Sequence, residues 1–231
     1  MALISDRLSR FKPSLTVKIS QIAREMSSSG ENVISLSSGE PDFDTPVHIK
    51  ESAINAIKSG FTKYTQVDGI PDLKQSILEK FKKENDLSYK IDQVTVGAGG
   101  KHVIYNLLMA TINKNDEVII PSPYWVSYPD MVSLAGGKAV IVDTEMENSF
   151  KITPKQLEES ITENTKWFIL NSPGNPTGAV YGEKELIGLS KILLKYPHVQ
   201  ILSDDIYEHI IYDQCFVNIL NVEPRLYDRT F

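Results

Sequence analysis

The sequence predicts an α/β fold in which a mostly parallel sheet carries helices on both faces. From Asp116 onward, short runs rich in β-branched residues alternate with longer segments that have helical spacing. The short runs are continuously apolar instead of alternating, which is typical of strands covered on both faces. Regular alternation of strand and helix favours parallel strands joined by crossover helices.

Each element of this domain can be located from its pattern. The strands are expected at residues 117–121, 138–143, 166–171 and 199–204. The connecting helices are expected at residues 125–134, 154–161 and 183–195. Thr153-Pro154 is a good start signal for one of them, since a capping side chain precedes a proline in the first turn.

The first part of the chain has a different organisation. Helices are expected at 19–28, 47–58 and 71–83, and the passage 35–46 between them is irregular and rich in Gly, Pro and Asp. We therefore predict two domains: residues 1–46 as an N-terminal arm with part of a small domain, and residues 47–231 as a large domain. The last residues lead toward a strand and stop, so the large domain is expected to be incomplete at its C-terminus.

Composition excludes several classes of protein. The 231 residues are 41% hydrophobic and 23% charged, with a net charge of −6, which gives no general attraction to nucleic acid or to an anionic membrane. The chain has one cysteine, Cys215, so no intrachain disulfide can form and a reducing compartment is expected. No apolar run approaches the length of a bilayer span. We expect a soluble, cytoplasmic protein without a metal site.

A glycine-rich turn is the first candidate site. Val94-Thr-Val-Gly-Ala-Gly-Gly-Lys-His102 reads as a strand over 94–96, a turn, and then a helix over 103–112. Free backbone N–H groups and the positive end of the helix dipole can bind a phosphate there, and glycine allows its close approach. The alternative is an ordinary tight turn that binds nothing.

Three further motifs follow predicted strands. Asn171-Ser-Pro-Gly-Asn-Pro-Thr-Gly178 places Asn175 between two prolines at the carboxyl end of the sheet, where open α/β sheets bind ligands. Ser203-Asp-Asp-Ile-Tyr-Glu-His209 brings Asp204 and Tyr207 to the same edge, where a carboxylate can hold a pyridine nitrogen protonated. Pro121-Ser-Pro-Tyr-Trp-Val-Ser-Tyr128 contains Trp125, which offers an indole face for stacking on a planar ring. The plainer readings are a proline turn, a turn cap and a core tryptophan.

In their order and spacing these motifs resemble the landmarks of class I aminotransferases of the aspartate aminotransferase family, in the N-terminal part of such an enzyme. Ser38-Gly-Glu-Pro-Asp-Phe43 and Tyr64 belong to the same series, so the resemblance covers essentially the whole chain. It implies the large domain of a fold-type I enzyme that uses pyridoxal 5'-phosphate (PLP). Such enzymes are normally homodimers with active sites at the subunit boundary.

The resemblance also implies roles in cofactor binding. Gly99, Gly100 and Lys101 would lie around the PLP phosphate, and Trp125 would stack on the pyridine ring. Asn175 and Tyr207 would contact the phenolic oxygen of PLP, and Asp204 would contact its ring nitrogen. Asp205 is the next carboxylate to consider if Asp204 does not face the ring.

Contacts to the substrate and to the second subunit follow from the same resemblance. Gly39 would bind the substrate α-carboxylate through its backbone, and Trp125 and Asn175 would also contact the substrate. Tyr64 would reach the phosphate of the neighbouring subunit's cofactor. Residues 11–16 resemble the subgroup that accepts aspartate and sometimes prephenate, in which Lys12 would face a second substrate carboxylate.

One departure from the family pattern limits what the 231 residues can do. The lysine that carries PLP as a Schiff base lies beyond the Asp-x-x-Tyr strand in the family, and the only cations after His209 are Arg225 and Arg229. The chain is therefore expected to be truncated and inactive alone, in a lineage that transfers amino groups between an acidic amino acid and a 2-oxo acid. Alternatives are another fold-type I enzyme such as a carbon–sulfur lyase, or a non-catalytic fragment that dimerises. A nucleotide-binding protein fits poorly, because the glycine turn lacks the Walker and Rossmann spacings.

Overall fold

The structure, a computed structural model, describes residues 3–10, 15–37 and 39–231. By its internal contacts the chain divides into two compact units, Met1–Phe11 with Asp68–Phe231, and Lys12–Val67. This division falls after Val67, whereas the predicted boundary falls after residue 46. The assignment of residues 1–46 to a small domain stays a prediction.

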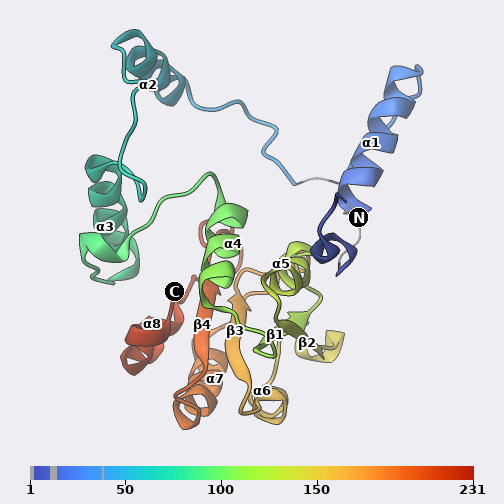
Figure 1. Cartoon of the computed structure of the whole chain (residues 1–231), viewed down its shortest axis with the longest axis vertical. Helices are drawn as coiled ribbons and strands as arrows, with labels where there is room; N and C mark the ends of the chain where they lie inside the picture. Colours follow the sequence, from blue (N-terminus) through green and yellow to red (C-terminus); the bar gives the residue numbers. More distant parts are fainter. Residues whose placement is uncertain (1–2, 11–14, 38) are drawn as a thin grey trace. The chain divides into compact units, whose positions relative to one another are not determined.

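A four-stranded sheet forms the centre of the larger unit. Its strands are β1 (Glu117–Ser122), β2 (Lys138–Asp143), β3 (Thr165–Asn171) and β4 (Gln200–Asp204). They lie in the order β2-β1-β3-β4, and all three pairings are parallel (Figure 1). The predicted α/β class with a parallel sheet is confirmed.

Helices cover both faces of this sheet, as the unbroken apolar strands predicted. On one face Phe168 and Leu170 of β3 share a core with α6 (Pro154–Ser160), α7 (Glu183–Lys195) and α8 (Ile219–Val222). On the other face Trp167 and Ile169 pack with α4 (Gly100–Thr111) and α5 (Ser127–Ala135). Because neighbouring residues of a strand point to opposite faces, one run of four apolar residues supplies both cores.

The start of α6 agrees with the start signal in its sequence. The Thr153 hydroxyl accepts a hydrogen bond from the backbone N–H of Gln156, at 3.2 Å. The Gln156 side chain in turn accepts one from the backbone N–H of Thr153, at 2.9 Å. This capping box satisfies two backbone donors that the helix cannot satisfy internally.

The strand predicted over residues 94–96 does not form, and this expectation was wrong. The segment follows α3 (Pro71–Asn85) and a short 3-10 helix at Ile91–Gln93. Its one backbone bond outside that turn runs from the N–H of Val96 to the carbonyl of Asp68, at 2.9 Å. A strand requires a partner that pairs with successive residues, and a single bond is no ladder.

Beyond β4 the chain returns to the sheet. A 3-10 helix spans Pro224–Arg229, and Thr230 then forms a parallel bridge to Ile201. The N–H of Phe231 donates to the carbonyl of Ile201 at 2.9 Å, and the Phe231 carbonyl accepts from the N–H of Ser203 at 2.8 Å. The last residues are expected to lead toward a strand, and Thr230 and Phe231 pair with β4 in the manner of one.

The smaller unit contains the helices α1 (Leu15–Ser28) and α2 (Val47–Lys58). None of the residues of α2 is buried. Large apolar side chains of the unit are exposed, including Val17, Ile19, Phe43, Ile49 and Phe61. Among the described residues, no helix is both long enough and apolar enough to cross a membrane.

Candidate functional site

Two neighbouring strands, β3 and β4, place the polar residues that follow them at one edge of the sheet. Asn171 and Asp204, their last residues, are paired in the register. The Asn171 side chain donates to the carbonyl of Asp204 at 2.8 Å and accepts from the N–H of Asn175 at 2.8 Å. Asn171 therefore fixes the proline loop against the end of β4 and sets the distance between Asn175 and Asp204.

The carboxylate of Asp204 has a buried phenol as its partner. Tyr128 of α5 is 2% exposed, and its hydroxyl donates to Oδ2 of Asp204 at 2.5 Å. Burial raises the pKa of Tyr128 far above its usual value, and the charge of Asp204 raises it further. The phenol therefore stays protonated and acts as the donor, which orients the carboxylate.

Two more predicted residues lie beside this pair. The rings of Trp125 and Tyr128 meet edge to face, with centroids 5.3 Å apart. The ammonium of Lys101, in the first turn of α4, lies 5.1 Å from the centroid of the Trp125 ring. Through Tyr128 the structure thus links Lys101 at the start of α4, Trp125 in the loop after β1, and Asp204 at the end of β4.

Tyr207 and Asn175 approach each other across the ends of β3 and β4. The side-chain nitrogen of Asn175 lies 3.5 Å from the Tyr207 hydroxyl, at the outer limit of a hydrogen bond. Both side chains are partly buried. An amide donor and a phenol so close together can bind one shared oxygen acceptor.

The glycine-rich turn combines tight packing with an open surface. At Gly97 a Cβ would lie 2.6 Å from the Val103 side chain, so only glycine fits there. Gly99 has a φ of 91° and precedes α4, which begins at Gly100. At Gly99 and at Gly100 an added Cβ would meet no described atom within 4 Å. The first N–H groups of α4 lack intrahelical partners, so they are available to an anion.

Three predicted residues belong to the other of the two units. Gly39 and Tyr64 belong to the separate unit Lys12–Val67, in which Tyr64 is fully exposed. Lys12 lies outside the described residues. The roles expected for these three residues stay predictions.

Sequence reasoning missed two members of the site, Tyr128 and Asn171. Both stand inside motifs that were recognised, but neither was given a role. Tyr128 follows Trp125 by three residues, the spacing that puts two side chains on one face of a helix. A polar aromatic residue at this spacing was the available signal.

Asp205 was the alternative carboxylate, and its side chain makes different contacts. Its two oxygens accept from the Ser203 hydroxyl at 2.8 Å and from the Asn218 amide at 2.6 Å. Burial raises the pKa of Asp205 from its ordinary 3.8 to about 6, although these two bonds lower it in part. Asp204 is the carboxylate held by Tyr128, whose ring also packs against Trp125.

The raised pKa of Asp205 predicts a specific dependence of stability on pH. The folded chain binds the proton of Asp205 more tightly than the unfolded chain does. The contribution of Asp205 to the free energy of unfolding therefore falls as the pH rises from 4 to 6. In Asp205→Asn this loss is absent, so the variant should gain on the order of 1–3 kcal/mol relative to the parent between pH 4 and pH 7. Urea unfolding across this range measures the difference. Asp213→Asn, at an exposed position of the same segment, is the control, and equal pH dependence in all three proteins would contradict the prediction.

A small cavity adjoins the site, since Tyr128 and Asn171 are part of its lining. Its volume is about 30 Å³, and its lining includes Ile120, Tyr124, Asn175 and Tyr181. This is room for about one water molecule and far below the size of a cofactor site.

Comparisons with known proteins point to one family. The family model described as "Aminotransferase class I and II" matches residues 31–230. An aspartate/prephenate aminotransferase of Cereibacter sphaeroides is 58% identical over 231 residues, which are all of this chain and 58% of the relative. An aspartate/prephenate aminotransferase of Nitrosomonas europaea is 52% identical over 98% of this chain and 57% of its own length.

Solved structures show the same fold. The aspartate aminotransferase of Rhizobium meliloti superposes with a TM-score of 0.94 at 45% identity. The matched part is all of this chain and 58% of the Rhizobium chain. The aspartate aminotransferase of Thermus thermophilus with maleate gives 0.94 at 41% identity, with 100% of this chain and 59% of its own. The chain thus spans somewhat under three fifths of these relatives and has the aspartate aminotransferase fold. This chain belongs to the class I and II aminotransferase family.

Proposed function

We propose that this chain forms the cofactor-binding part of a PLP-dependent aminotransferase, which moves an amino group between an acidic amino acid and a 2-oxo acid. One observation carries the proposal. The Asp204 carboxylate, oriented by the buried Tyr128 phenol at 2.5 Å, stands at the sheet edge next to the pair Asn175 and Tyr207. The family to which the chain belongs uses PLP, and the assembled side chains offer the chemistry that this cofactor requires.

The groups present fit PLP part by part. The start of α4 offers backbone N–H groups beside open space at Gly99 and Gly100, which suits a phosphate. The indole of Trp125 offers a flat surface for a pyridine ring. Asp204 supplies a negative charge for a protonated ring nitrogen, and no other part of the cofactor requires a carboxylate.

The residues of this chain then have distinct tasks. When bound, PLP supplies an electron sink that stabilises negative charge at the substrate α-carbon. Asp204 holds a proton on the ring nitrogen, and Tyr128 keeps the carboxylate aimed by donating to Oδ2. Asn175 and Tyr207 donate to the phenolic oxygen, and Trp125 excludes water from one face of the ring. Lys101, above the outer edge of the indole, adds positive charge near the phosphate.

An acidic substrate is supported by the relatives. Two of the most similar proteins are named aspartate/prephenate aminotransferases, and a solved relative is described with maleate, a four-carbon dicarboxylate. In our proposal Lys12 faces the second carboxylate of such a substrate and the backbone of Gly39 binds the first. Trp125 and Asn175 also contact the substrate. Aspartate is the first amino acid to test, and prephenate is the 2-oxo acid to test beside 2-oxoglutarate.

We further propose that the working form is a cytoplasmic homodimer. Tyr64 is exposed on the unit Lys12–Val67, and in a dimer it would reach the phosphate site of the other subunit. Residues 1–46 would contribute to a small domain, and residues 47–231 to the large one. The cofactor-carrying lysine of the family has no counterpart after Tyr207 in this sequence, so we propose that the 231 residues alone are inactive.

Amino-group transfer by the chain extended with its natural continuation tests the function. We expect glutamate to form from 2-oxoglutarate when aspartate is the donor, and the 231 residues alone to form none. Coupled assays follow glutamate and oxaloacetate together, since transfer yields them in equal amounts. Release of ammonia and pyruvate from a thioether amino acid such as cystathionine, with no glutamate formed from aspartate and 2-oxoglutarate, would instead identify a carbon–sulfur lyase and reject the proposal.

A further inference from the structure

The segment that carries Tyr207 has little apolar packing to position it. It turns directly after β4, with the N–H of Glu208 donating to the carbonyl of Asp205 at 2.9 Å and that of Ile210 to Tyr207 at 2.8 Å. The apolar residues on either side of Tyr207, Ile206 and Ile210, are 66% and 56% exposed. Burial of apolar surface therefore does not determine where the phenol lies, and polar contacts must do so.

On the N-terminal side of Tyr207, the carboxylate of Asp205 holds the turn to the rest of the larger unit. Asp205 accepts from the hydroxyl of Ser203 and from the amide of Asn218, as described above. Asn218 is buried, and its side chain also accepts from the N–H of Leu220 at 2.8 Å, which caps α8. This contact ties the beginning of the turn to the start of α8.

A second carboxylate, Glu208, anchors the other side of Tyr207 to α3. Glu208 forms an ion pair with Lys80, and its second oxygen accepts from the amide of Asn85 at 2.8 Å. The Lys80 ammonium also donates to the Asn85 side-chain oxygen at 2.8 Å, which closes a three-membered cluster. The backbone carbonyl of Asn85 accepts from Asn221 of α8 at 2.7 Å. The cluster thus links α3, the turn and α8 across more than 120 residues of sequence.

A metal ion is not the natural occupant of this region. Ligand atoms of Glu84, Glu208 and His209 lie within 4.8 Å of one another, as in a possible cation site. The Lys80 ammonium is already paired with Glu208 and lies 3.9 Å from Glu84. A cation is therefore already supplied by the chain itself.

The cluster contributes geometry more than stability. Desolvation raises the pKa of Glu208, but the bonds from Lys80 and Asn85 outweigh this, so the pKa lies below its usual value and the carboxylate is charged at neutral pH. The side chains of Glu208 and Lys80 are 13% and 30% exposed. Partly buried ion pairs of this kind add little net stability, yet removing one partner leaves an uncompensated charge.

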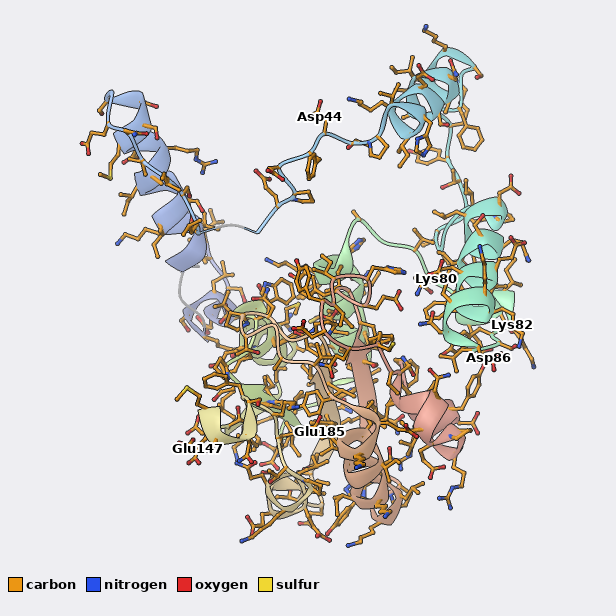
Figure 2. The ribbon with its side chains drawn as sticks, turned by 180° about the vertical axis from the view of Figure 1, so that it is seen from behind. Asp44, Lys80, Lys82, Asp86, Glu147 and Glu185 are labelled. Carbon is orange, nitrogen blue, oxygen red and sulfur yellow. The ribbon has the colours of Figure 1, made fainter. Side chains whose placement is uncertain are left out.

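A neighbouring pair on the same helix provides a contrast. Lys82 and Asp86 form an ion pair at 2.9 Å, with side chains that are 63% and 86% exposed. Lys80 lies on the side of α3 that faces the rest of its unit, and Lys82 and Asp86 lie away from it (Figure 2). Within the part of the chain that the structure describes, no side-chain hydrogen bond or ion pair joins Lys82 or Asp86 to another element.

We propose that Lys80, Glu208 and Asn85 form a positioning cluster, which holds the turn 205–210 so that the Tyr207 phenol lies beside Asn175. The three residues touch neither the cofactor nor the substrate, and they act through Tyr207. The role of the Tyr207 phenol in cofactor binding rests on the proposed function, whereas the restraint of the turn by the cluster does not.

Hydrogen exchange of the 231-residue chain tests the restraint. In Lys80→Met the amides of residues 206–210 should exchange at least about tenfold faster, because local opening no longer breaks the ion pair. Lys82→Met should leave them unchanged, and exchange in β1 and β3 should be the same in both variants. The exchanged pair Lys80→Glu with Glu208→Lys should restore slow exchange, since the Asn85 amide can turn over to serve the reversed charges. Equal exchange of residues 206–210 in the parent, Lys80→Met and Lys82→Met would overturn the proposal.

A spectroscopic experiment on the full-length holoenzyme tests the link to Tyr207. The pH at which the absorbance of bound PLP changes should shift in Lys80→Met in the same direction as in Tyr207→Phe. In the double variant of Lys80→Met and Tyr207→Phe the two shifts should not add, because Lys80 acts through a hydroxyl that Tyr207→Phe has already removed. Additive shifts would overturn the positioning role, even if the exchange result holds. If no PLP binds at all, the proposed function fails while the exchange experiment still decides the fate of the cluster.

Discussion

Replacing Asp204 by alanine in the full-length protein should slow amino-group transfer about a thousandfold or more, with PLP still bound. In our proposal the carboxylate would hold a proton on the ring nitrogen, and this positive charge would stabilise the negative charge that develops at the substrate α-carbon. Losing a charge-assisted hydrogen bond at such a site costs several kcal/mol in the transition state, and about 4 kcal/mol corresponds to a thousandfold. Tyr128 then also loses the acceptor for its buried hydroxyl.

Single-turnover transfer from aspartate, with PLP occupancy followed by absorbance, measures this effect. Asn175→Ala and Tyr207→Phe should be milder, since each removes one hydrogen bond to the phenolic oxygen. Asp205→Ala is the matched carboxylate control, because its oxygens are bonded to Ser203 and Asn218. A rate near that of the parent in Asp204→Ala, together with a large loss in Asp205→Ala, would move the role to Asp205.

Replacing Phe168 by alanine should lower the free energy of unfolding of the 231-residue chain by about 3–5 kcal/mol. Phe168 is 0% exposed and lies in β3, between Ile119 of β1 and Ile201 of β4 in the register. Its side chain belongs to the core under α6 and α7, so truncation leaves a cavity bounded by strands that cannot collapse freely. The loss is a large share of the roughly 5–15 kcal/mol that stabilises a typical domain.

Urea unfolding followed by fluorescence and circular dichroism measures this loss. Phe43→Ala removes the same side chain at a position that is 85% exposed, and its effect should stay within about 0.5 kcal/mol. A similar small change in both variants would mean that the core between β3 and α7 is not packed as described.

The sequence by itself determined the elements of the large unit and the edge at which its polar motifs gather. The centres of β1 and β3, residues 118–120 and 167–170, are apolar throughout and buried, which is typical of strands covered on both faces. Since all the strands are parallel, residues that follow different strands must meet at one edge. The sequence pattern therefore predicts that Asn175 and Asp204 lie at the same edge of the sheet.

Only the tertiary structure decided which side chains became partners there. Tyr128 and Asp204 are 76 residues apart, and Glu208 and Lys80 are 128 apart, so no local pattern links them. The segment 94–96 has the apolar composition of a strand but lies where no partner strand pairs with it, so it stays irregular. Periodicity reports what a segment can bury, whereas hydrogen-bond partners depend on which segments the folded chain brings alongside it.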